Sequence, residues 1–161
     1  MTAAWTLPAA RALTACAAAA SLALACSEAE TPEQRVRAVL AALEESAQQR
    51  DAGAIKQHVS DAYSDGNGND KRAAIQLVAF HLLRNQSVHL LTRVQSLEIP
   101  APAEAQASVL VAMAGTPIEG PEALLALRAD LYRFDLSFRE EDGDWRIRSA
   151  SYRPAAVEDF R

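Results

Sequence analysis

The chain has 161 residues, a formal net charge of −5 and only two cysteines, Cys16 and Cys26. An acidic balance argues against a nucleic-acid partner, which requires clustered Lys and Arg. A chain of this length can bury the core of one domain without disulfide bonds. We therefore expect a single acidic domain.

The first 25 residues have the pattern of an export signal. Arg11 precedes an apolar run over 12–25, and the chain turns polar directly after Cys26. An export signal needs a positive start, about 7–15 apolar residues and small residues at the cleavage site. An uncleaved membrane span would need about 20 apolar residues, which is more than this run provides. We predict a signal peptide over 1–25, a tether over 26–30 and one domain over 31–161.

The end of this signal, Ala23-Leu24-Ala25-Cys26, resembles the bacterial lipobox. The resemblance implies that the Cys26 thiol carries a diacylglycerol and that the new amine receives a further acyl chain such as palmitate. The run that ends at Cys16 is an alternative lipobox, but Arg11 would then lie inside its apolar segment. A chain anchored at Cys26 belongs to the cell envelope, and Ser27 after the Cys favours the outer membrane, facing the periplasm.

Cleavage before Cys26 changes the chemistry and the charge of the mature chain. Cys16 leaves with the signal and Cys26 carries lipid, so no thiol remains for a disulfide, a metal site or a nucleophile. Loss of Arg11 leaves 15 basic against 21 acidic residues, a formal charge of −6. That balance argues against electrostatic docking on membranes, which acyl chains make unnecessary.

Three helices are predicted after the tether. Thr31-Pro32-Glu33-Gln34 is a capping box with Pro at the first helical position, and apolar spacing carries this helix to about Arg50. Asp51 can cap a second helix, which ends at Tyr63. Asp70 can cap a third helix over 71–84, and Asn85 suits the left-handed position at its C-terminal end.

Strand patterns fill the second half of the chain. The predicted strands are 87–99, with a bulge and an end at Pro100, then 104–114, 130–139 and 144–153, and the Asp142-Gly143 pair joins the last two as a hairpin. Residues 122–128 fit a helical turn or a strand start. The predicted core residues are Leu40, Leu43, Val78, Leu82, Val109, Val111, Phe134 and Trp145.

This order of elements resembles the nuclear transport factor 2-like superfamily, a cone-shaped α+β fold related to ketosteroid isomerase and the SnoaL-like polyketide cyclases. The resemblance covers about residues 31–154 and rests on the opening helix, the second helix with its loop, and the closing hairpin. It implies three helices packed on a strongly curved antiparallel sheet, with an apolar pocket between the sheet and the long helix.

In the isomerase branch of that superfamily, the general base is an Asp near the end of the second helix, opposed by a Tyr and a protonated Asp. Asp61, Tyr63 and Asp65 lie in the corresponding region of this chain, where Asp61 and Asp65 are equally explained as a solvated helix end and a turn residue. The predicted pocket-lining residues are Asp61, Tyr63, His81, Arg93 and Tyr132. We assign none of them a catalytic role.

The sequence provides weak patterns for metals. Asp65, Asn67 and Asn69 alternate as calcium ligands do, but Asp70 stands where such a loop needs Gly and Gln76 where it needs Glu. The three His residues lack the spacing of a metal pair on one element. We predict no metal and no cofactor.

Three classes of function are consistent with these residues. The first is a lipid-tethered domain that binds a small apolar or acidic ligand or another protein without turnover. The second is a small isomerase or cyclase with Asp61 or Asp65 as base, and the third is a subunit of an envelope assembly that exposes an apolar outer sheet face. A homodimer through the sheet is compatible with the first and third classes.

The lipobox predicts that the mature protein begins at acylated Cys26. Mass spectrometry of the N-terminal peptide from the membrane fraction will find both acyl modifications there. A mature N-terminus elsewhere, with unmodified Cys26, would contradict the prediction.

Overall fold

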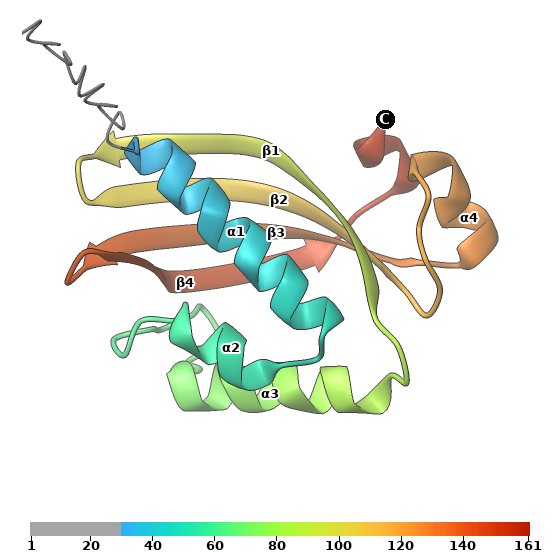
Figure 1. Cartoon of the computed structure of the whole chain (residues 1–161), viewed down its shortest axis with the longest axis horizontal. Helices are drawn as coiled ribbons and strands as arrows, with labels where there is room; N and C mark the ends of the chain where they lie inside the picture. Colours follow the sequence, from blue (N-terminus) through green and yellow to red (C-terminus); the bar gives the residue numbers. More distant parts are fainter. Residues whose placement is uncertain (1–29) are drawn as a thin grey trace, which may run out of the picture.

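The computed structural model describes residues 30–161, so the predicted signal peptide and Cys26 lie outside the described residues. A layer of helices covers one face of a strongly bent, four-stranded antiparallel sheet (Figure 1). This is the α+β architecture that the order of elements predicted, so the fold class is confirmed. No helix among residues 30–161 is long and apolar enough to cross a membrane.

Side-chain caps start each helix of this layer. Helix α1 spans Pro32–Gln48, and the side chains of Thr31 and Gln34 each bond the backbone of the other, as a capping box requires. Helices α2 and α3 span Ala52–Gln57 and Lys71–Arg84, and their caps are Asp51 and Asp70. All three starts agree with the sequence prediction.

The end of the second helix differs from the prediction. Helix α2 stops at Gln57 rather than at Tyr63 because the next residues pair with the last strand of the sheet. The Ser60 amide donates to the Ile147 carbonyl at 3.0 Å, and the Ile147 amide donates to the His58 carbonyl at 2.8 Å. These bonds use backbone groups that a continued helix would need.

The end of α3 also differs from the prediction. Asn85 is extended (φ −102°, ψ 131°) rather than left-handed. Its carbonyl accepts a hydrogen bond from the Arg50 guanidinium at 2.6 Å, which pins the exit of α3 to the end of α1. The chain therefore leaves α3 directly toward the first strand.

The sheet has the strand order β1-β2-β3-β4. Its strands are β1 His89–Ala101, β2 Glu104–Ala114, β3 Asp130–Glu141 and β4 Asp144–Pro154. The predicted bulge lies between Val94 and Ser96. Asp142 and Gly143 both have positive φ (53° and 87°), which fits the tight turn between β3 and β4. Pro100 does not end β1, because an edge strand tolerates a residue without an amide donor.

Short helical turns cover part of the outer face of the sheet. The ambiguous segment forms a 3₁₀ turn at Pro121–Ala123 and helix α4 at Leu124–Leu127, and a further turn lies at Val157–Phe160. Leu124, Val157 and Phe160 pack on the outward residues Leu110 and Ala112 of β2. The opposite face of the sheet packs on the helical layer.

The main core lies between that layer and the sheet. Its buried members are Val36, Val59, Tyr63, Ala105, Ala107, Val109, Phe138, Trp145 and Ile147. Of the predicted core residues, Leu82, Val109 and Trp145 are buried, and Leu40, Leu43, Val78 and Val111 are partly buried against the clusters. Phe134 is partly buried, and its ring lies within 6.3 Å of two tyrosine rings.

We expect Phe138→Ala to cost about 3–5 kcal/mol of unfolding free energy, since Phe138 is 2% exposed in the main core. Phe134→Ala, on the same strand and the same side of the sheet, serves as a matched variant and should cost less than half as much. Urea unfolding of both variants measures the difference. Equal losses would show that the two rings are equally packed.

Candidate functional site

The helix-facing side of the sheet is the first candidate site. Tyr63 lies deep in it, only 8% exposed and packed in the main core. Burial, together with the neighbouring Asp65 carboxylate, raises the pKa of Tyr63 above its usual value. Tyr63 is therefore held neutral among apolar side chains, and its ring is part of the packed core rather than of the wall of an open pocket.

Asp61 points away from this core. Its side chain is 89% exposed and forms an ion pair with Lys71, whose Nζ lies 2.7 Å from Asp61 Oδ1. The hydrogen bond and the charge of Lys71 lower the pKa of Asp61 below its ordinary value. The pair lies at a hollow of about 500 Å³ between α2 and α3, lined by Lys56, Asp61, Asp70, Lys71, Arg72, Ile75 and Gln76.

Asp65 organises the loop between α2 and α3. Its carboxylate accepts hydrogen bonds from the Asn69 side chain at 2.8 Å and from the amides of Asn69 and Asn67 at 2.9 and 2.8 Å. These donors lower the pKa of Asp65. A general base works best with a pKa near the operating pH, so the environments of Asp61 and Asp65 both oppose that role.

Two predicted pocket residues lie elsewhere. Arg93 is on the outer face of the sheet, where its guanidinium donates to the carbonyl of Phe160, so the prediction that it lines the cone is wrong. The alternation of side chains along a strand divides its residues between two faces of the sheet, but it does not show which face the helices cover. His81 lies on an exposed position of α3.

Three aromatic rings form a partly uncovered surface on the helix-facing side. The ring of Tyr132 lies 6.3 Å from that of Phe134 and 5.9 Å from that of Tyr152, and the rings of Phe134 and Tyr152 are 5.7 Å apart. Tyr152 is 66% exposed. We call these three residues the aromatic shelf. Only Tyr132 was predicted as a pocket residue, and the β3–β4 register, which pairs Phe134 with Tyr152, brings the others beside it.

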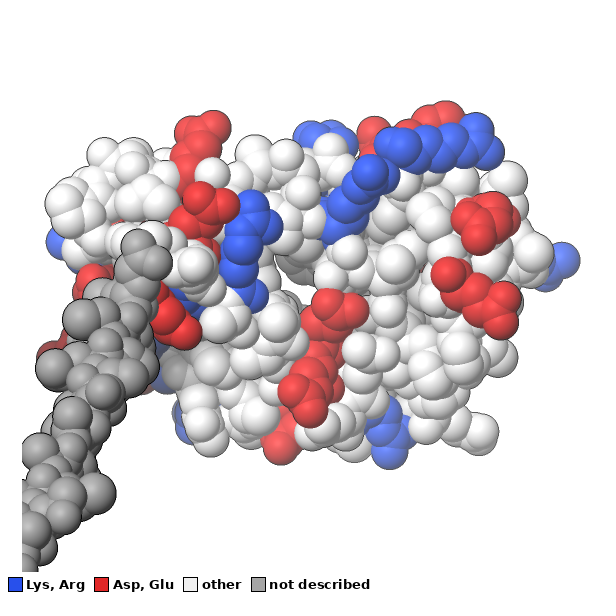
Figure 2. All heavy atoms as spheres, turned by 45° about the horizontal axis from the view of Figure 1, so that its top comes forward, with Lys and Arg blue, Asp and Glu red and all other residues white. Residues whose placement is uncertain are grey.

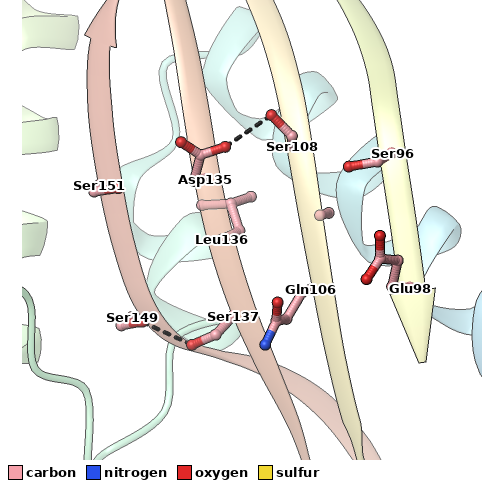
Figure 3. A pocket seen from close by; sticks show the side chains of 10 residues that line it. Ser96, Glu98, Gln106, Ser108, Asp135, Leu136, Ser137, Ser149 and Ser151 are labelled. Atoms are coloured by element: carbon pink, nitrogen blue, oxygen red, sulfur yellow. Dashed lines mark hydrogen bonds between the residues drawn. The ribbon is translucent and has the colours of Figure 1, made fainter. Parts of the chain in front are cut away.

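The outer face carries a second, polar hollow that the sequence did not predict. It has a volume of about 430 Å³ and crosses all four strands (Figure 3). Ser108 donates to Asp135 at 2.7 Å, and the hydroxyls of Ser137 and Ser149 are 2.7 Å apart. We call this region the serine face; its lining residues are Ser96, Glu98, Gln106, Ala107, Ser108, Asp135, Leu136, Ser137, Ser149 and Ser151.

Charges and metal ligands do not mark a further site in the described part of the chain. On the side seen in Figure 2, acidic and basic side chains are interspersed rather than gathered in one large patch of a single sign. Within residues 30–161, no group of three His, Cys, Asp or Glu side chains could hold a metal ion.

The comparisons with known proteins show a shared fold and nothing beyond it. No family model matches the chain, and neither does any curated protein sequence. A protein of unknown function from Silicibacter pomeroyi, described as NTF-2 like, superposes with a TM-score of 0.57 at 16% identity, over 75% of this chain and 93% of that one. A candidate dehydratase of the NTF2-like family from Streptomyces avermitilis gives 0.61 at 12% identity, over 76% and 95%. The chain has the nuclear transport factor 2-like fold.

The ion pair with Lys71 predicts a titration for Asp61. Its pKa should lie below that of the unfolded chain, so the pair stabilises the fold at neutral pH and is lost as the pH falls through the depressed folded value. In Lys71→Met the pKa should return toward its ordinary value. NMR titration of the Asp61 carboxyl carbon measures both. A wild-type pKa near neutrality would contradict this assignment and restore Asp61 as a base.

Proposed function

We propose that the chain is a lipid-anchored envelope protein whose domain binds a small ligand without turnover. The anchor rests on the lipobox-like sequence that ends at Cys26. The binding role rests on the fold and on the surroundings of its acidic and aromatic side chains. Small-molecule pockets in proteins are mostly apolar, with a few polar groups that decide the chemistry.

The observation that carries the proposal is the contrast between the acids and the aromatic shelf. Asp61 and Asp65 are solvated, hydrogen-bonded and lowered in pKa, which suits structural carboxylates. The shelf, by contrast, presents large rings at the helix-facing side of the sheet, and Tyr152 is mostly exposed. Aromatic rings bury much apolar area on contact with a ligand.

The shelf favours an apolar or aromatic ligand over an acidic one. Arg93, which was predicted to line the pocket, bonds the Phe160 carbonyl on the other face of the sheet. The hydroxyls of Tyr132 and Tyr152 remain as polar groups beside the rings. A flat ligand with one or two hydrogen-bonding atoms fits this set.

A second candidate is association with another copy of the chain through the serine face. Small side chains allow close approach, and the hydroxyls can bond across a wet interface. The region is polar rather than apolar, so the permanent envelope assembly that an apolar outer face would indicate is less well supported. Sedimentation of the mature protein with Ser137→Arg tests this contact: the variant should remain monomeric where the wild type associates.

The binding role predicts a specific pattern among variants. Wild type, Asp61→Asn and Asp65→Asn should all lack turnover on a panel of enolisable ketones and steroids. Tyr152→Ala should weaken binding of a hydrophobic fluorescent probe by about tenfold, as expected for an aromatic contact of about 1.5 kcal/mol. Leu125→Ala, at another exposed apolar residue, is the matched control and should leave binding unchanged.

Isothermal titration measures the binding of the probe, and continuous absorbance assays measure turnover. Wild-type turnover that falls by a hundredfold in either Asn variant would replace the binding role by the isomerase one. Equal probe binding in wild type and Tyr152→Ala would exclude the shelf as the site.

A further inference from the structure

The hollow between α2 and α3 carries more positive than negative charge. Its cationic lining residues are Lys56 in the last turn of α2 and Lys71 and Arg72 at the start of α3, and its acids are Asp61 and Asp70. Its volume of about 500 Å³ lies within the range of roughly 300–1,000 Å³ that small-molecule pockets occupy. The hollow can therefore hold a small ligand, and the sign of its charge bears on which one.

Both acids of the hollow are already engaged, whereas two of the cations are not. The Asp70 carboxylate accepts a hydrogen bond from a backbone amide in the first turn of α3 at 2.8 Å. Asp61 forms its ion pair with Lys71. Neither Lys56 nor Arg72 has an ion-pair partner among residues 30–161. Two unpaired positive charges therefore border one hollow.

The pair between Asp61 and Lys71 is unequal in a way that suits exchange of the acid. The Lys71 side chain is only 17% exposed, whereas that of Asp61 is 89% exposed. The mostly buried stem fixes the amino group of Lys71 at the hollow, but its acidic partner extends into water. Because exposed ion pairs contribute little to stability, another anion can replace Asp61 on Lys71 at small cost.

The positive potential of the hollow reaches the carboxylate of Asp61. The hydrogen bond and charge of Lys71 lower the pKa of Asp61 most, and the charges of Arg146 and Lys56 lower it further. An anion at the same point would be stabilised by the same charges. An amine or a metal ion there would be repelled by them.

The hollow also has an apolar wall. Ile75 lines it and packs against the main core on its other side. The aliphatic stems of Lys56 and Lys71 add further apolar surface, since long cationic side chains keep only their heads in water. A charged rim above an apolar wall matches a ligand that has both characters.

We propose that this hollow binds a small organic anion, a carboxylate or a phosphate on a short apolar chain. The ligand's oxygens bond the side chains of Lys56 and Arg72. They also replace Asp61 as the partner of Lys71, while the apolar chain lies against Ile75. None of these residues belongs to the aromatic shelf, so the site is independent of the proposed function and of the lipid anchor.

Isothermal titration of the full-length protein in a non-ionic detergent tests this site, with butyl phosphate and hexanoate as probes. Lys56→Gln and Arg72→Gln should each weaken binding by roughly fivefold, the upper end for an exposed ion pair. Asp61→Asn should tighten binding, because the competing carboxylate is removed. Arg153→Gln, at an exposed arginine on β4, is the matched control and should change nothing. The tighter of the two probes identifies the preferred head group.

NMR titration of the Asp61 carboxyl carbon tests the exchange itself. At saturating butyl phosphate the pKa of Asp61 should rise, since the ligand takes Lys71 and adds a negative charge nearby. An unchanged pKa would show that the anion does not replace Asp61 and would overturn the site as drawn.

Four results of the binding experiment would also overturn the proposal. They are the absence of saturable binding of both probes to wild type, equal losses in Lys56→Gln and Arg153→Gln, inorganic phosphate binding as tightly as butyl phosphate, and loss of binding in Tyr152→Ala. The last result would place the anion on the aromatic shelf. The first three would leave the shelf and the lipid anchor untouched.

Discussion

The pairing of residues 58–64 with strand β4 determines where the polar groups of this domain point. Ser60 and His58 exchange backbone hydrogen bonds with Ile147, and the Ser64 amide donates to the Arg148 carbonyl. The buried Ser60 hydroxyl also donates to Glu141 at 2.7 Å. This segment ends α2 early, covers the edge of β4 and joins the helical layer to the sheet at a point where backbone groups would otherwise need water.

The orientation of the acids follows from that pairing. Once Val59 and Tyr63 are fixed in the main core, Asp61 between them faces solvent and meets Lys71 at the start of α3. Had α2 continued to Tyr63, the side chains would follow helical spacing and the acids would be placed differently. The same backbone bonds thus keep Asp61 out of the core, which supports the proposed binding role over a catalytic one.

Local signals allowed the sequence to predict the helix starts and the last hairpin. Caps at Thr31, Asp51 and Asp70 depend on residues within three positions, and the Asp142-Gly143 turn depends on its own backbone angles. The end of α2 could not be predicted, since its competing partner, Ile147, lies 90 residues away in the chain. The aromatic shelf and the position of Arg93 likewise depend on strand register and on which face is covered, which alternation alone leaves open.

Amide hydrogen exchange at Ser60 and Ile147 tests the edge pairing most directly. If the pairing holds, both amides will exchange as slowly as those between β3 and β4, because they open only when the sheet does. Exchange of the Ser60 amide as fast as that of the exposed loop residue Gly66 would show that the segment does not hold the edge of β4, and the orientation of Asp61 derived from it would fall.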